Sequence, residues 1–240
     1  MINLPQGAYL IVATGTDIGK TFLLEKICQK LRDCKIIVSA VKPVASSFRD
    51  DDLQSDSAKI LQALGRKITA ENIAEITPWR FAAPLAPSLA AAAENKKIIF
   101  DEVKNFCAEK ILQLQNENFH SQNLSGISAK AAVQNKNFLF IESAGGVMTP
   151  LSDDKTFLDL AVALKIPVLL LTANYLGAIS HTLCAVEALR SKAISIERII
   201  VNNFAAGQSS SEVKMADTIT TIKNFSQIAT ITLDDFIIGL

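Results

Sequence analysis

The stretch AYLIVATGTDIGKT, at residues 8–21, constrains this chain more than any other. It opens with an apolar, β-branched run typical of a buried strand and continues as a glycine-bearing polar turn that ends in Gly19, Lys20 and Thr21. A helical pattern follows directly. This order is typical of a P-loop, in which backbone N–H groups and the helix dipole bind a polyphosphate. Lys20 would then reach the β- and γ-phosphates, and the Thr21 hydroxyl would bind Mg²⁺.

The glycine spacing departs from the usual pattern G-x-x-x-x-G-K-[ST]. Thr14 stands where that pattern has its first glycine, and Gly15 comes one position later. The alternative is a glycine-capped turn between a strand and a helix, in which Lys20 is merely solvated. The strand before the turn and the amphipathic stretch after it favour the P-loop.

Composition sets the broad class of protein. The chain has 240 residues, 49% of them hydrophobic, which is enough for a substantial core. It carries 24 basic and 24 acidic residues, so net charge gives no overall case for nucleic acid or an anionic membrane. No apolar run approaches the roughly 18 residues of a membrane span. We therefore expect a cytoplasmic protein with neither nucleic acid nor membrane among its partners.

The cysteines and histidines point the same way. No C-x-x-C pair occurs, and Cys28, Cys107 and Cys184 lie within apolar helical patterns, so we expect buried, reduced thiols. His120 and His181 are far apart in sequence, which gives little support to a histidine metal cluster.

Strand and helix patterns alternate along the whole chain. We find no internal repeat and no linker, and we read residues 115–137 as a polar surface loop with a short helix near 129–133. Alternation of this kind predicts a doubly wound, mostly parallel α/β sheet with helices on both faces, in a single P-loop NTPase-like domain over residues 1–240. We expect helices at residues 20–32, 55–64, 101–114, 156–164 and 211–224, and another that follows residues 176–181 and lasts to about 190. Further strands are expected at 35–41, 138–141, 167–171, 196–201 and 228–233.

Three charged residues are candidate contacts for a ligand or a metal ion, and one of them, Lys42, stands at the carboxyl end of a strand, where open α/β sheets bind ligands. Lys42 follows the second strand, Asp56 begins a helix, and Glu142 ends the apolar run 138–141. An acid at the end of a buried strand is a Walker-B arrangement that can hold Mg²⁺. The alternatives are a solvated lysine, a helix N-terminal charge favoured by the dipole, and an acid in a tight turn.

Other segments leave two interpretations open. Gly145 and Gly146 permit close backbone approach to a ligand. Residues 84–87, with two prolines, either line an apolar pocket or pack on the core. The helix start after residue 176 could hold an anion, or Ser180 could simply cap it. Asn202 and Asn203 could read an adenine edge or form a turn.

Several blocks of sequence, taken in order, resemble the dethiobiotin synthetase family. The blocks are residues 14–21, 41–46 (VKPVAS), 55–58, 81–87, 142–151 (ESAGGVMTPL) and 176–181, and the resemblance spans about residues 8–203. It implies a doubly wound P-loop fold, a homodimer, ATP and Mg²⁺, with 7,8-diaminopelargonate and CO₂ as substrates. The family places its first loop glycine at the position of Ala13, which accounts for Thr14.

The resemblance also implies roles for individual residues. Lys20 and Lys42 would neutralise the phosphates and a substrate carbamate, and Ser46 would hydrogen-bond the reacting end of the substrate. Thr21, Asp56 and Glu142 would be the Mg²⁺ ligands. The implied nucleotide contacts are Thr16, Asp17, Ile18, Gly19, Lys20, Thr21, Glu142, Gly145 and Asn203. The implied substrate contacts are Ser46, Gly145, Gly146, Val147, Gly177, Ala178, Ile179 and Ser180, the last four supplied by the partner subunit.

Three other classes of protein compete with this one. A switch ATPase of the partition or division-site type should carry an extra lysine early in its loop, whereas Lys20 is the only loop lysine here. An amidotransferase-type ligase needs a glutaminase domain, for which 240 residues leave little room. A nucleotide-binding partner domain without catalysis is the third. The sequence gives no nucleotide preference beyond adenine and does not separate Asn202 from Asn203.

Overall fold

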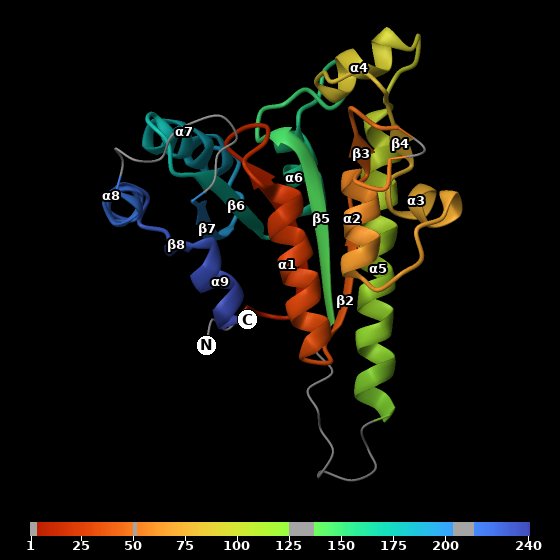
Figure 1. Cartoon of the computed structure of the whole chain (residues 1–240), viewed down its shortest axis with the longest axis horizontal. Helices are drawn as coiled ribbons and strands as arrows, with labels where there is room; N and C mark the ends of the chain where they lie inside the picture. Colours follow the sequence, from red (N-terminus) through yellow and green to blue (C-terminus); the bar gives the residue numbers. More distant parts are fainter. Residues whose placement is uncertain (1–3, 50–51, 125–136, 204–213) are drawn as a thin grey trace.

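The computed structural model describes residues 4–49, 52–124, 137–203 and 214–240. At its centre is a six-stranded sheet in the order β2-β5-β1-β6-β7-β8, in which every neighbouring pair is parallel (Figure 1). The strands of this sheet are β1 (Gly7–Ala13), β2 (Ile37–Val41), β5 (Asn137–Gly146), β6 (Val168–Ala173), β7 (Ile196–Asn202) and β8 (Thr230–Thr232). Two short strands, β3 (Val44–Ala45) and β4 (Trp79–Arg80), form a separate parallel pair.

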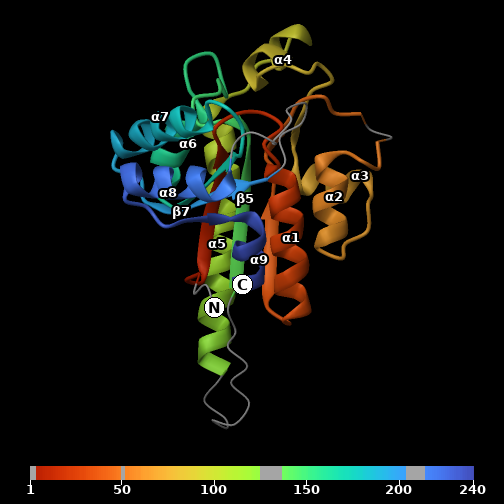
Figure 2. The same ribbon diagram turned by 60° about the vertical axis from the view of Figure 1, so that its left-hand side comes forward.

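Helices cover both faces of the sheet (Figures 1 and 2). One face carries α1 (Lys20–Asp33), α2 (Asp56–Ala63) and α9 (Leu233–Gly239), and the other carries α5 (Phe100–Leu124), α6 (Phe157–Leu164), α7 (Ala178–Arg190) and α8 (Met215–Ser226). α3 (Ala70–Ile76) lies beyond the β2 edge, and α4 (Pro87–Ala93) lies beyond the carboxyl ends of the strands. The predicted doubly wound, parallel α/β fold is confirmed.

Burial explains why the central strands read as continuous apolar runs. β6 is buried along its whole length, and β1 is buried from Ala8 onward, because helices pack on both faces of each strand. β2, at the edge of the sheet, alternates between exposed and partly covered residues before its last two. The core therefore sits on both sides of β1, β5 and β6, and the carboxyl ends of these strands are held rigidly.

The strands also define where a ligand would bind. The chain leaves β1 through α1 on one face, whereas it leaves β5 toward α6 on the opposite face. β1 and β5 are neighbours in the sheet, so a crevice opens between their carboxyl ends. In open α/β sheets such a switch point is where ligands bind.

One prediction about the elements was wrong, and two short helices were missed. Residues 115–124 continue α5 instead of forming a loop, since they contain helix-compatible Leu, Gln and Glu and no glycine or proline. Residues 125–136, which include the helix expected near 129–133, lie outside the described residues. α3 and α9 were not predicted, because each is only seven residues long. Each has a threonine N-cap as its local signal: Thr69 accepts from Asn72 N, and Thr232 accepts from Asp235 N.

The thiols divide into two pairs. Cys28 and Cys107 are buried, as expected, and burial raises the pKa of each to about 12. Cys34 and Cys184 are exposed. The expectation of a buried Cys184 was wrong, because its face of α7 turns toward solvent.

Within the described ranges, no helix combines the length and the apolar composition that crossing a bilayer would require.

Candidate active site

The loop between β1 and α1 is built around Gly19. Gly19 is the N-cap of α1 and has a left-handed backbone, with φ of 99°. A Cβ at this position would lie 2.5 Å from Asn202 Nδ2, and that amide donates to the carbonyl of Ile18 at 3.0 Å. Glycine is therefore required both by the backbone angle and by the close approach of β7. The last residue of β7 thus holds the loop in place.

Lys20 begins α1 and points back over the loop. Its ammonium donates to the carbonyl of Gly15 at 3.2 Å, and the residue is 6% exposed. Burial lowers the pKa of Lys20 to about 8, because removal of the ammonium from water outweighs the attraction of Glu142. An anion placed in this loop would restore the ordinary preference for the charged form.

Lys42 lies between two carboxylates. Its Nζ is 2.9 Å from Glu142 Oε1 and also forms an ion pair with Asp56 Oδ2. Thr21 Oγ1 donates to the same Glu142 Oε1 at 2.7 Å. Burial disfavours the ammonium of Lys42, but Glu142 and Asp56 together raise its pKa above the ordinary value. Burial would likewise raise the pKa of Asp56, yet Lys42 lowers it below the ordinary value.

Each member of this cluster comes from a different element. Lys42 follows β2, Glu142 lies on β5, and Thr21 is on the first turn of α1. Asp56 begins α2, whose N-cap is Ser55, and the Ser55 hydroxyl accepts from Ala58 N at 3.3 Å. The parallel strands bring these side chains to one edge of the sheet, beside the crevice between β1 and β5.

A cavity of about 1170 Å³ opens over this cluster. Its walls include residues 84–87. Of the two interpretations of that segment, the structure therefore favours a pocket wall and not a loop packed on the core. The predicted site residues that line the cavity are Thr16, Asp17, Gly19, Lys20, Thr21, Lys42, Ser46, Asp56, Glu142 and Gly145.

The remaining predicted residues lie elsewhere. Ile18 is buried, and Val147 N donates to Ala13 O at 3.0 Å, which ties Val147 and its neighbour Gly146 to the start of the loop. Gly177, Ala178, Ile179 and Ser180 form the start of α7, outside the cavity wall. Gly177 is the N-cap of α7, so capping by Ser180 was wrong. Asn202 lines the cavity, whereas Asn203 is exposed and does not.

Sequence reasoning missed several residues of the site. Thr149 Oγ1 accepts from Gly146 N at 2.8 Å and closes the turn after β5. Glu25 and Lys59 bring opposite charges to the cavity wall. Their only signal was helical spacing, because Glu25 lies one turn after Thr21 and Lys59 lies one turn after Asp56.

The oxygen atoms of this cluster suit Mg²⁺. Glu142 Oε2 is buried and has no hydrogen-bond partner in the part of the chain that the structure describes. With Asp56 and Thr21 it offers the hard oxygen ligands that Mg²⁺ prefers, and one or two carboxylates plus phosphate oxygens are its usual set. Among the described residues no group of three or more His, Cys, Asp or Glu could hold a metal ion. The two carboxylates of Asp56 and Glu142 therefore have no third such ligand beside them.

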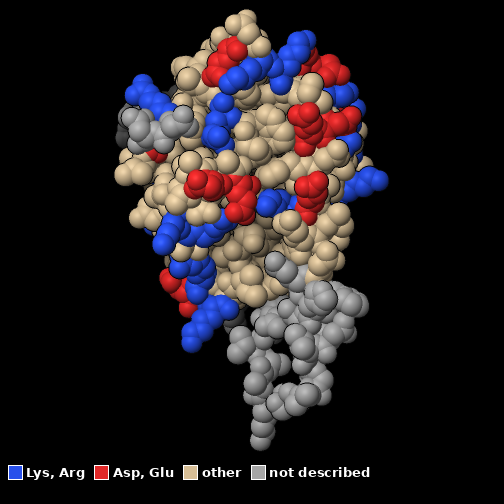
Figure 3. All heavy atoms as spheres, turned by 90° about the vertical axis from the view of Figure 1, so that its right-hand side faces the viewer, with Lys and Arg blue, Asp and Glu red and all other residues tan. Residues whose placement is uncertain are grey.

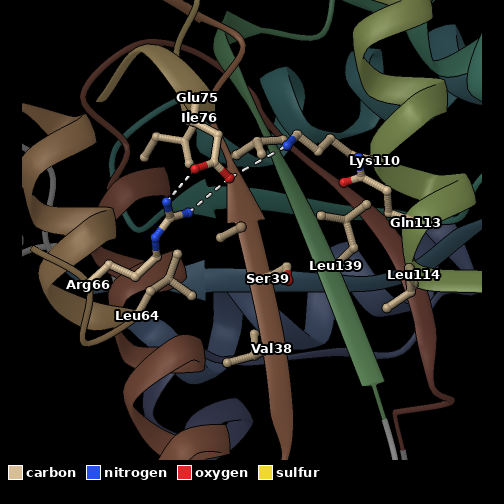
Figure 4. A pocket seen from close by; sticks show the side chains of 12 residues that line it. Val38, Ser39, Leu64, Arg66, Glu75, Ile76, Lys110, Gln113, Leu114 and Leu139 are labelled. Atoms are coloured by element: carbon tan, nitrogen blue, oxygen red, sulfur yellow. Dashed lines mark hydrogen bonds and ion pairs between the residues drawn. The ribbon is translucent and has the colours of Figure 1, made fainter. Parts of the chain in front are cut away.

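A second, smaller cavity of about 230 Å³ lies along the free edge of β2 (Figure 4). Arg66 and Lys110 both reach toward Glu75 there, with an Arg66–Glu75 hydrogen bond of 3.2 Å and a Lys110–Glu75 distance of 3.7 Å. The hydrogen bond from Arg66 lowers the pKa of Glu75 below its ordinary value. Acidic and basic side chains are intermingled over this side of the molecule (Figure 3). No predicted site residue lines this cavity.

The sheet, the loop with Lys20 and Thr21, and the acid at the end of β5 define a P-loop nucleotide-binding protein. The fold is shared with the MinC:MinD cell division protein complex of Aquifex aeolicus, at a TM-score of 0.50 and 14% identity, covering 96% of this chain and 84% of that one. A family model described as an AAA domain matches residues 7–232.

Similarity in sequence is more specific. The ATP-dependent dethiobiotin synthetase of Methylobacterium nodulans is 37% identical over 196 residues, which cover 80% of this chain and 79% of that protein. The enzyme of the same name from Acidiphilium cryptum is 35% identical and covers 81% and 78%. This chain belongs to the family of ATP-dependent dethiobiotin synthetases.

Proposed function

We propose that this protein closes the ureido ring of 7,8-diaminopelargonate with CO₂ and ATP to give dethiobiotin, in biotin biosynthesis. One observation carries the proposal: Lys42, Asp56 and Glu142 converge with the P-loop residues Lys20 and Thr21 on a single large cavity. Family membership supplies the substrates, because the relatives at 35–37% identity are dethiobiotin synthetases.

The chemistry needs charge neutralisation and positioning, with no covalent nucleophile from the protein. One amine of the substrate adds to CO₂ and loses a proton, which gives a carbamate. A carbamate oxygen attacks the γ-phosphorus of ATP, and ADP leaves. The second amine then attacks the carbonyl carbon of this carbamic–phosphoric anhydride, which closes the ring and expels phosphate.

The cavity residues fit these steps. Lys20 and Lys42 would neutralise the transferred phosphoryl group and the carbamate. Ser46 Oγ is buried and has no hydrogen-bond partner among the described residues, so it is free to donate to the reacting end of the substrate. Residues 84–87 offer an apolar wall to the aliphatic chain.

Thr21, Asp56 and Glu142 would hold Mg²⁺. A bound Mg²⁺ would neutralise charge that develops on the β- and γ-phosphate oxygens. The residues themselves orient one another: Thr21 donates to Glu142, which fixes that carboxylate against the start of α1.

We further propose a homodimer in the cytoplasm. Gly177 to Ser180 do not line the cavity of their own chain, so they would complete the site of the partner subunit. The N-terminus of α7, a helix of 13 residues, would bind the substrate carboxylate through N–H groups of its first turn. Exposed free Cys34 and Cys184 are compatible with a reducing compartment.

The direct test is incorporation of labelled bicarbonate. Purified protein with diaminopelargonate, ATP and Mg²⁺ should place one labelled carbon in dethiobiotin for each ADP released. Omission of the diamine should abolish both labelled product and stoichiometric ADP release. Absence of ring-closed product, in a preparation shown to bind nucleotide and metal, would refute the proposal.

A further inference from the structure

The ammonium of Lys42 contacts the same two carboxylate groups that a divalent metal ion would need. Lys42 Nζ contacts Asp56 Oδ2 and lies 2.9 Å from Glu142 Oε1. Thr21 Oγ1 also bonds to Glu142 Oε1, at 2.7 Å. Two of the three side chains that fit Mg²⁺ thus contact a monovalent cation supplied by the protein, and the third, Thr21, bonds to one of those two.

We infer that Lys42 is a stand-in cation, which closes the metal site while it is empty and must leave when a divalent ion enters. It neutralises two carboxylates, one of them fully buried, that would otherwise repel each other. This inference concerns the regulation of the proposed active site. It rests on the proposed function only for the group that Lys42 meets after it moves.

The two cations compete for the same pair of carboxylates. Mg²⁺ takes carboxylate oxygens at about 2.1 Å and prefers an octahedral shell. An ammonium that contacts both Asp56 and Glu142 occupies the space between those carboxylates, and like charges at such separations repel strongly in a buried site. Repulsion between the ammonium and the metal ion therefore drives Lys42 away from at least one carboxylate as the metal binds.

The cavity gives Lys42 a place to go. It adjoins Ser46, whose buried Oγ has no hydrogen-bond partner among the described residues, and both side chains line the cavity. Anionic phosphate or carbamate oxygens in that space would replace the carboxylates as partners of the ammonium. Metal binding is thus weak until an anion arrives, and nucleotide and metal favour each other by an equal factor.

The test measures metal affinity without nucleotide or diamine, with Mn²⁺ as the probe. In Lys42→Met the side chain keeps most of its length and loses its charge. We expect the variant to bind one Mn²⁺ at least ~10-fold more tightly than the wild type. Binding is measured from the electron paramagnetic resonance signal of free Mn²⁺. The added affinity should disappear in the double variant Lys42→Met/Glu142→Gln, which removes one ligand charge.

Lys59→Met is the matched control. Lys59 lines the same cavity from α2 and forms no ion pair with Glu142 within the described part of the chain, so its loss removes an equal charge without freeing the carboxylate pair. We expect less than ~3-fold tighter binding in this variant. Equal gains in both variants, or no gain in Lys42→Met, would overturn the inference.

Folding and function are kept separate from this outcome. If Lys42→Met does not fold, Lys42→Gln is measured instead with the same expected sign, since glutamine is neutral and can still donate to Glu142. A protein that fails to make dethiobiotin but shows this gain in affinity refutes the proposed function and leaves the inference standing.

Discussion

Two ion clusters lie next to the same strand and differ chiefly in burial. At the carboxyl end of β2, Lys42 pairs with Glu142, and their side chains are 7% and 0% exposed. Along the free edge of β2, Arg66 pairs with Glu75, and their side chains are 32% and 48% exposed. Both clusters join basic and acidic side chains from separate elements, but only the first opens onto the large cavity.

The contrast shows how burial changes what an ion pair can do. Water can replace Glu75 as the partner of Arg66, and Arg66 as the partner of Glu75, at little cost in free energy. Their pairing therefore adds little to stability. Lys42 and Glu142 have no such exchange available, and each requires the other until a ligand or a metal replaces it. In the buried cluster a ligand or metal ion can therefore replace one member of the ion pair. The exposed cluster only shields the edge of β2.

The largest expected effect is on turnover. Lys42→Ala should lower kcat by at least ~100-fold, because it removes a positive charge from the transferred phosphoryl group. Nucleotide affinity should stay within about 3-fold, since Lys20 and the loop N–H groups remain. The measurements are ADP release at saturating substrate and a fluorescence titration with a nucleotide analogue.

Lys110→Ala is the matched variant in the exposed cluster. It removes a lysine that also pairs with a glutamate, yet Lys110 lies outside the large cavity. Its kcat should stay within about 2-fold of the wild type. A near-normal rate in Lys42→Ala would show that the role given to this residue is wrong.

The next effect concerns protons. The free enzyme holds the pKa of Lys20 near 8, below the ordinary value, and phosphates in the loop would raise it. Below pH 8 the ammonium is already charged, so ATP binding takes up little proton. Above pH 8 the amine is neutral, so binding must take up a proton, and affinity should fall by up to ~10-fold per pH unit.

Calorimetry in buffers of different ionisation enthalpy measures this uptake. The number of protons should rise from near zero at pH 7 toward one at pH 9. Lys20→Met should abolish the pH dependence, and Lys110→Ala should preserve it. Constant uptake across this range in the wild type would mean that burial does not control Lys20.

The fold, and the convergence of the candidate site residues, could be predicted from the sequence because both follow from strand order. Parallel strands bring their carboxyl ends to one edge, so Lys42 and Glu142 had to lie near the loop that carries Lys20. Lys42 and Glu142 each follow an apolar run directly, and that placement is a local signal in the sequence.

Contacts across long sequence distances left no such signal. The amide of Asn202 bonds to the carbonyl of Ile18, 184 positions away, and no pattern near either residue announces it. Arg66, Glu75 and Lys110 come together only because α3 and α5 flank the same strand edge. Nor does a sequence of polar residues reveal that α5 continues to Leu124, since exposed helices and loops share composition.

The smallest expected effect tests the exposed cluster itself. Glu75→Gln should change the free energy of unfolding by less than about 1 kcal/mol, because water replaces the lost partner of Arg66. Urea denaturation is measured at 0.05 M and 1 M NaCl, where the Debye length is about 14 Å and about 3 Å. The difference in unfolding free energy between Glu75→Gln and the wild type should be smaller at the higher salt concentration. Lys42→Ala, by contrast, leaves Glu142 buried without its counter-ion and should destabilise by about 3 kcal/mol at both salt concentrations. If Glu75→Gln were equally costly and equally insensitive to salt, burial could not be what separates the two clusters.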